Sequence, residues 1–114
     1  MNNQIMDSAH PPSLTEQLKI TEATKLMESQ GFRLNRVADR DDPSRNILVS
    51  FWCNRSFMCP LCEERHLKGE RSAHPFVTIS EDKTLFHCRV SRMSFDLHKV
   101  IKEIESNMPK IFRQ

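Results

Sequence analysis

The sequence contains very little glycine and no long apolar run, and both absences exclude classes of function. Only two of its 114 residues are glycine, Gly31 and Gly69, so the chain cannot form a glycine-rich phosphate-binding loop. No apolar run approaches the ~20 residues that a membrane-spanning helix needs, and we expect no membrane partner. The N-terminus lacks a basic stretch followed by an apolar segment, so we also expect no signal peptide.

Cysteine occurs only four times, and all four copies lie between residues 53 and 88. Without a signal peptide, the expected setting is an intracellular, reducing compartment, either the cytoplasm or the nucleus. In such a compartment, grouped thiols bind metal more often than they form disulfides.

Charge is nearly balanced, with 17 basic and 15 acidic side chains and a formal net charge of +2. Residues 1–30 hold two lysines and four acidic side chains, whereas residues 31–114 hold the remaining 15 basic and 11 acidic ones. The larger part of the chain therefore has the composition for a basic face. An ordinary solvated surface explains these numbers equally well, so charge alone is weak evidence for nucleic acid.

The order of sequence patterns predicts a single small α+β domain. We expect a disordered leader over residues 1–12, which are polar and end in two prolines. One zinc-binding domain then follows over residues 13–114, and its zinc module occupies about residues 53–92. The predicted architecture is a set of zinc-ribbon-like β-hairpins flanked by an N-terminal and a C-terminal helix.

The first helix is predicted from about Leu14 to Gln30. Ser13 and Glu16 fit a capping box, and Gly31 stands where a helix end favours positive φ. Four apolar residues at helical spacing form a stripe that we expect to enter the core, and these are Ile20, Ala23, Leu26 and Met27.

A second helix is predicted from about Phe95 to Asn107. Ser94 is a suitable N-cap, and Asp96 suits the first turn of the helix. Its predicted apolar face consists of Leu97, Val100, Ile101 and Ile104.

Two β-hairpins are predicted between these helices. Residues 32–37 and 46–52 are rich in strand formers and flank a polar, proline-containing turn at residues 39–44. Residues 76–79 and 84–88 form a second pair of short strands around a turn at residues 80–83.

A group of cysteine and histidine residues predicts one structural Zn²⁺ site. Cys59 and Cys62 form a Cys-x2-Cys pair, His66 follows after three intervening residues, and Cys88 stands at the end of the second hairpin. A Cys-x2-Cys turn presents two thiolates on one bend, and the hairpin returns a third to it. Three thiolates and one imidazole would fill a tetrahedral site and leave no open position for a catalytic water.

The fourth ligand and the chemistry of the pair have alternatives. His66 is favoured because it lies close to the pair, while His74 and His87 remain alternatives. Cys53 follows Trp52 in an apolar stretch, and we expect it to pack as a small hydrophobic residue. Cys-Pro-x-Cys is also an active-site motif of dithiol oxidoreductases, but the βαβ pattern that this chemistry needs is absent before it.

Residues 57–92 resemble the zinc ribbon of DNA primases. The resemblance rests on Cys-Pro-Leu-Cys at 59–62, on the run from His74 to Ser80, on Asp82-Lys83 and on Phe86-His87-Cys88. Bacterial primases have histidine where this chain has Cys62, a final cysteine where it has Ser91, and a shorter insert. The module of herpesvirus-type and other large-DNA-virus primases, and of eukaryotic primase-polymerases, is more similar.

The resemblance implies an accessory role in replication or priming. In such primases the zinc module contacts single-stranded template, while a separate domain with paired metal-binding carboxylates performs catalysis. We therefore expect single-stranded DNA or RNA as a ligand, a replication or polymerase protein as a further partner, and no enzymatic activity. The predicted nucleic-acid-binding residues are Arg65, Lys68, Arg71, Lys83, Arg89 and Arg92.

Two further expectations concern the aromatic residues and the competing function. Phe57, Phe76 and Phe86 are candidates for a base-stacking surface, although at least two of the three are expected to fill the core. The alternative function is a protein-interaction adaptor or inhibitor, because zinc ribbons also serve as rigid platforms and the net charge is close to zero. A positive patch would favour nucleic acid, and a flat apolar patch would favour a protein partner.

Overall fold

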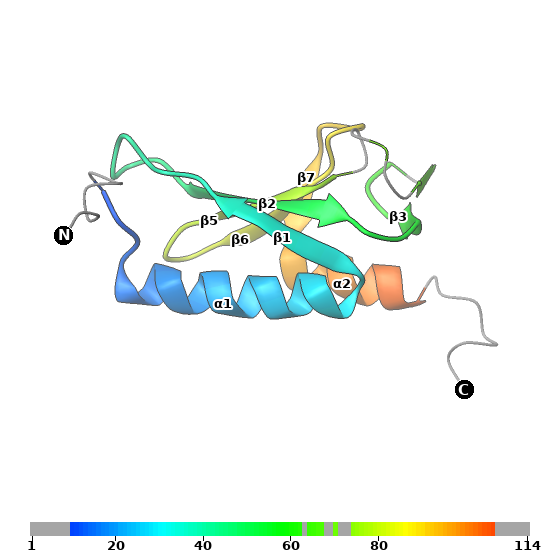
Figure 1. The fold of residues 1–114 in the computed structure, drawn as a ribbon, viewed down its shortest axis with the longest axis horizontal. Helices are drawn as coiled ribbons and strands as arrows, with labels where there is room; N and C mark the ends of the chain where they lie inside the picture. Colours follow the sequence, from blue (N-terminus) through cyan, green and yellow to red (C-terminus); the bar gives the residue numbers. More distant parts are fainter. Residues whose placement is uncertain (1–9, 63, 68–69, 71–73, 107–114) are drawn as a thin grey trace.

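The structure is a computed structural model, which describes residues 10–62, 64–67, 70 and 74–106. Figure 1 shows how its helices and strands are arranged in space. In chain order the elements are α1 (Leu14–Ser29), β1 (Phe32–Val37), β2 (Ile47–Cys53), β3 (Phe57–Cys59), β4 (Glu64–His66), β5 (Phe76–Ile79), β6 (Thr84–His87), β7 (Ser94–Asp96) and α2 (Leu97–Ser106).

The fold is α+β, as the sequence predicts. Five antiparallel strands form one sheet in the order β1-β2-β5-β6-β7, and both helices lie against the same face of it (Figure 1). The two predicted hairpins, β1–β2 and β5–β6, are confirmed, and they join because β2 also pairs with β5. A separate hairpin, β3–β4, lies at one end of the sheet.

The core lies between the sheet and the helices. Alternate residues of β2 and β5 point to opposite faces, as strand geometry requires, so Val49 and Val77 are fully buried while Leu48 and Thr78 remain at least partly exposed. The predicted apolar face of α2 is buried throughout, and Ala23 and Met27 of α1 are buried with it. Ile20 and Leu26 pack against this core while remaining partly exposed.

The predicted ends of α1 are confirmed in detail. The Ser13 hydroxyl accepts a hydrogen bond from the Glu16 amide at 3.1 Å, and a Glu16 carboxylate oxygen accepts one from the Ser13 amide at 2.9 Å. Gly31 follows the helix with φ of +91°, a conformation that side chains with a Cβ rarely adopt.

Arg40 fixes the start of α1 in a way that the sequence did not indicate. Its guanidinium makes two hydrogen bonds to the Glu16 carboxylate, at 3.0 and 3.1 Å, and both side chains are 8% exposed. It also donates to the carbonyl oxygens of His10 and Pro11. These contacts hold the last residues of the predicted leader, residues 1–12, of which residues 1–9 lie outside the described part.

The predicted start of the second helix was wrong by two residues. Helix α2 begins at Leu97, and Ser94 is instead the first residue of strand β7, where it pairs with His87. Strand pairing with β6 holds residues 94–96 extended, so Asp96 becomes the capping residue. Its carboxylate accepts a hydrogen bond from the Lys99 amide at 3.3 Å. Within the described residues, neither helix has the length and apolar character needed to cross a membrane.

Candidate metal centre

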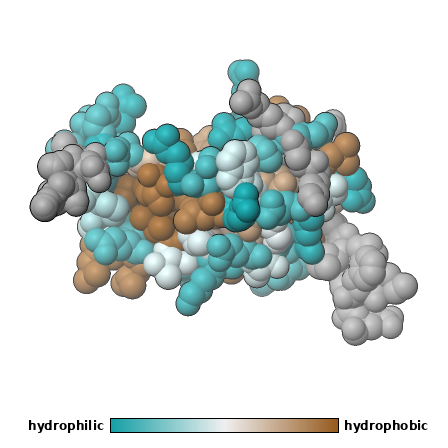
Figure 2. All heavy atoms as spheres, viewed as in Figure 1, coloured by the Kyte–Doolittle hydropathy of each residue, from teal (hydrophilic) through white to brown (hydrophobic). Residues whose placement is uncertain are grey.

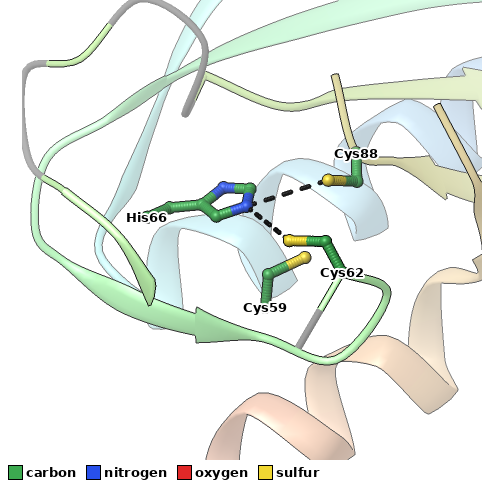
Figure 3. A group of neighbouring side chains, drawn as sticks. All are labelled: Cys59, Cys62, His66 and Cys88. Carbon is green, nitrogen blue, oxygen red and sulfur yellow. Dashed lines mark hydrogen bonds between the residues drawn. The ribbon is translucent and has the colours of Figure 1, made fainter. Parts of the chain in front are cut away.

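Three of the predicted ligands come from one short hairpin. Cys59 ends β3 and pairs with Glu64, so the chain reverses through Cys62 and returns along β4 to His66. Figure 3 shows the Cys59 and Cys62 sulfur atoms and the His66 ring pointing toward one another. The Cys-x2-Cys bend and the strand that follows it therefore bring these three side chains together within eight residues of chain.

The fourth predicted ligand arrives from the main sheet. Cys88 directly follows β6, and the next residues form a tight turn in which the Arg92 amide donates to the Cys88 carbonyl at 2.8 Å. Arg92 has φ of +62°, and the Cys88 amide donates to the Met93 carbonyl at 3.0 Å. This turn places the Cys88 sulfur opposite the β3–β4 hairpin (Figure 3).

The distances within the group suit a tetrahedral metal ion. The ligand atoms of Cys59, Cys62, His66 and Cys88 all lie within 4.8 Å of one another. His66 Nε2 lies 3.0 Å from the Cys62 sulfur and 3.8 Å from the Cys88 sulfur. Donor atoms around tetrahedral zinc would be separated by roughly 3.5–3.8 Å, given metal–ligand bonds of about 2.0–2.3 Å. The four residues can therefore hold a metal ion.

Burial disfavours the thiolate form of these cysteines when no cation is bound. Cys59, His66 and Cys88 are buried and Cys62 is half-buried. Burial, together with the smaller effect of the nearby Cys88 and Cys62 sulfurs, raises the pKa of the Cys59 thiol to about 12. A metal ion would supply the positive charge that stabilises closely spaced thiolates in such a site.

The pKa of the Cys88 thiol moves in the opposite direction. Burial acts to raise it, but hydrogen bonds from the hydroxyl and amide of Ser91, from the Val90 backbone and from the Cys59 thiol together outweigh burial and leave it below its ordinary value. The Ser91 amide lies 3.4 Å from the Cys88 sulfur. Ser91 therefore stabilises the sulfur of a neighbouring candidate ligand.

The alternative histidine ligands make other contacts. His74 Nδ1 accepts a hydrogen bond from the Cys53 amide at 2.8 Å, and its ring lies edge-on to Trp52. His87 Nε2 lies 2.8 Å from the Thr78 hydroxyl. Cys53 is buried, with its thiol donating to the Arg55 carbonyl, and it packs among apolar residues as the sequence predicts. Of the described cysteines and histidines, His66 alone joins the three thiols.

The local structure around Cys59 does not match the active site of a dithiol oxidoreductase. Cys59 ends a strand and does not stand at the start of a helix. Its raised pKa also contrasts with the lowered pKa of a nucleophilic thiol in that class of enzyme.

The predicted nucleic-acid-binding residues do not all come together. Arg89 and Arg92 are exposed and border a hollow of about 260 Å³ together with Phe76 and His87. Lys83 lies in the β5–β6 turn, at the opposite end of that hairpin from Cys88, and Arg65 is exposed on β4. Lys68 and Arg71 lie outside the described residues.

The sheet presents a second feature that the sequence analysis missed, a partly exposed face away from the helices. We call it the open face. Strand register places one row of its side chains across the sheet, in the order Arg36, Ser50, Phe76, His87 and Ser94. Alternating exposed residues in the predicted strands were the available signal, but only the pairing of β2 with β5 aligns them.

An aromatic stack lies at the centre of the open face. Phe76 and His87 are parallel, with ring centroids 4.5 Å apart and an interplanar angle of 7°. The Arg89 guanidinium lies 4.8 Å from the Phe76 ring centroid, and Arg89 Nε donates to the His74 carbonyl at 2.6 Å. Phe57 and Phe86 are buried, so the expectation that at least two of the three phenylalanines fill the core is confirmed.

No family model, curated protein or solved structure matches this chain. The resemblance of residues 57–92 to primase zinc modules therefore stays a prediction.

Proposed function

We propose that this chain is a zinc-stabilised module that binds single-stranded nucleic acid through the open face and has no catalytic activity of its own. The observation that carries the proposal is the Phe76–His87 stack with Arg89 above Phe76. The primase resemblance adds a context, in which the module serves replication or priming beside a separate polymerase.

The donor set favours zinc among the common metals. Three thiolates and one imidazole are soft or borderline ligands, and they suit a tetrahedral d¹⁰ ion better than Mg²⁺ or Ca²⁺. Four protein ligands would complete the coordination, so the role we propose for zinc is structural. The ion would then join the β3–β4 hairpin to the main sheet through Cys88.

The open face offers both interactions that single strands use. Aromatic rings accept any unpaired base by stacking, at about 1–3 kcal/mol per base. Burial lowers the pKa of His87, so its ring is neutral at pH 7 and stacks as an uncharged aromatic. Arg33, Arg36, Arg89 and Arg92 are exposed nearby and can reach backbone phosphates.

Binding of labelled oligonucleotides tests the proposal. We would measure fluorescence anisotropy with single-stranded and duplex DNA and with single-stranded RNA, over a salt series. Zinc content would be confirmed by elemental analysis before each titration. We expect salt-sensitive binding that favours single strands.

Two matched pairs of variants locate the surface. Phe76→Ala should weaken binding by about 5- to 100-fold because it removes the ring on which His87 and Arg89 pack and so disrupts the stacking surface. Phe95→Ala, on edge strand β7, should leave binding unchanged. Arg89→Ala should weaken binding and reduce its salt dependence, while Arg45→Ala in the β1–β2 connection should do neither. If folded, zinc-loaded protein binds none of the oligonucleotides at low salt, nucleic-acid binding is refuted.

A specific observation also favours the alternative function of a protein-interaction adaptor. Figure 2 shows apolar side chains over the first turns of α1 and over β1. Leu14 and Leu18 are 73% and 65% exposed, and Leu34 and Val37 of edge strand β1 are also exposed. If nucleic acid fails to bind, Leu14→Ser with Leu18→Ser becomes the test, because it should abolish capture of a protein partner.

A further inference from the structure

A second hollow lies on the open face, on the other side of Arg89 from the Phe76–His87 stack. It has a volume of about 400 Å³, and the residues that border it include Asn35, Ser50, Trp52, His74 and Arg89. Arg89 borders both hollows. We infer that this second hollow holds an unpaired base and that Asn35 gives it a preference for adenine, an inference that rests on the proposed function.

The aromatic wall of this hollow is held in place by its neighbours. Trp52 is 39% exposed, and the His74 ring meets it edge-on with centroids 5.0 Å apart. His74 is itself fixed, because its Nδ1 accepts from the Cys53 amide and its carbonyl accepts from Arg89. A positioned indole with a free surface suits stacking of a base, since little side-chain freedom remains to be lost on binding.

The polar group of the hollow comes from a β-bulge. Leu34 pairs with Phe51 and Arg36 pairs with Ser50, so Asn35 is an extra residue between two paired positions. Bulges commonly redirect a side chain beside a functional site. Here the bulge gives Asn35 an exposed amide on the same face as Trp52.

Hydrogen bonds fix the orientation of the Asn35 amide. The Ser50 hydroxyl donates to the Arg36 carbonyl at 3.4 Å, so its oxygen accepts the hydrogen bond from Asn35 Nδ2 at 3.2 Å. The nitrogen of the amide therefore faces Ser50. The amide still has a second N–H and its carbonyl oxygen to offer to a ligand.

An amide with one donor and one acceptor suits adenine in particular. The amide oxygen accepts from the adenine N6 amino group while the N–H donates to the neighbouring ring nitrogen, a bidentate pairing typical of asparagine. Adenine presents this pair on two edges, N6 with N7 and N6 with N1, so either approach is productive. It also offers the larger stacking area of a purine to Trp52.

The test compares strands that differ in one base type. We would titrate the zinc-loaded full chain with labelled oligo(dA), oligo(dT) and oligo(dC), and with an oligo(dA) in which unsubstituted purine replaces some adenines and removes the N6 amino group. Anisotropy is expected to show about 5- to 100-fold tighter binding of oligo(dA) than of oligo(dT). Replacing adenine with purine should abolish most of that advantage.

Variants separate base recognition from general binding. Asn35→Ala should reduce the ratio of oligo(dA) to oligo(dT) affinity to the level that purine substitution leaves, while the salt dependence and the melting temperature stay unchanged. Asn46→Ala, at an exposed asparagine beside the β1–β2 turn, is the matched control and should keep the ratio. Ser50→Ala should reduce the ratio in part, because it removes the group that orients the amide.

The outcomes distinguish this inference from the function on which it rests. Equal binding of all three strands, or an adenine preference that survives Asn35→Ala, overturns the role of Asn35 and leaves single-strand binding intact. Loss of all binding in the wild-type protein overturns both. A preference that disappears with Asn35→Ala and with purine substitution supports the inference.

Discussion

Removing the metal with a chelator is expected to unfold the β3–β4 hairpin while the five-stranded sheet stays folded. Both strands of this hairpin are three residues long, and an isolated hairpin of this size is unstable in water. It is joined to the rest of the fold by the group of Cys88 with the other three candidate ligands and by Phe57, whose ring packs against Phe32 with centroids 4.9 Å apart. The rest of the fold contains the other buried apolar residues, so we expect it to stay folded without the metal.

The size of the metal's contribution follows from how little apolar surface the β3–β4 hairpin buries. Of the seventeen apolar residues that are buried in the described part, only Phe57 and Cys59 lie on β3–β4. Burying a phenylalanine contributes about 1.5–3 kcal/mol, whereas ordering the roughly ten residues of the hairpin costs on the order of 10 kcal/mol. A structural zinc ion contributes about 10–16 kcal/mol in zinc-finger peptides, which is enough to reverse that balance.

Hydrogen exchange followed by mass spectrometry measures this effect directly. We expect amides in residues 57–66 to lose their protection on chelation, while those of β2 and β5 keep theirs. Cys59→Ala should reproduce the chelated state without a chelator. Cys53→Ala is the matched control, because Cys53 is equally buried but does not belong to the metal-binding group, and it should retain one zinc per chain.

Two results would refute this reasoning. Unchanged protection of residues 57–66 in protein whose metal content has fallen to zero would show that the hairpin does not need the ion. Loss of protection throughout the sheet would show that the metal stabilises the whole domain and that the helix–sheet core is insufficient.

Three further predictions concern stability. Glu16→Gln should lower the free energy of unfolding by about 2–4 kcal/mol, because it removes the charged partner of buried Arg40. Hydrogen bonds from Arg40 hold the pKa of Glu16 below its ordinary 4.5, so its stabilising effect should be present above that pH and decline as the pH falls through the folded-state value. Urea titrations at several pH values check both points, and an equal acid response in wild type and variant would contradict the second. Gly31→Ala should lower the free energy of unfolding by about 1–2 kcal/mol in the same assay, since φ is +91° and a Cβ would lie 2.7 Å from the Arg55 side chain. An unchanged free energy of unfolding would disprove this strain. Ile101→Ala should lower stability by about 2–5 kcal/mol in thermal denaturation, whereas exposed His98→Ala on the same helix should change it by under about 0.5 kcal/mol, and similar effects of the two would contradict the packing of α2.

The parts of the fold that the sequence predicted correctly depend on residues close together in the chain. The capping box at Ser13 and Glu16, the glycine after α1 and the β1–β2 and β5–β6 hairpins all involve neighbours separated by a short turn. Three of the four grouped ligands likewise lie within eight residues, and the hairpin that carries Cys88 was itself predictable.

The parts that escaped prediction depend on pairing between distant segments. Strands β3, β4 and β7 have three residues each, too few for a recognisable alternation, and β7 was assigned to the following helix. Arg40 and Glu16 form an ion pair although they are 24 positions apart in the sequence, and no sequence motif predicts such a pair. The open face exists only because β2 pairs with β5, which aligns Ser50 with Phe76.

Cys88 has a position whose consequence extends beyond the metal centre. It stands between His87, which belongs to the aromatic stack, and Arg89, whose guanidinium lies above Phe76. Metal and nucleic acid would therefore bind to consecutive residues of the chain, and any effect of one on the affinity of the other must be reciprocal by thermodynamic linkage. If the ion increases the affinity for a nucleic-acid strand by some factor, a bound strand must increase the affinity for the ion by the same factor. The module would then bind zinc more tightly when a strand is bound than when it is free. Competition with a chromogenic chelator, with and without oligonucleotide, would measure this difference.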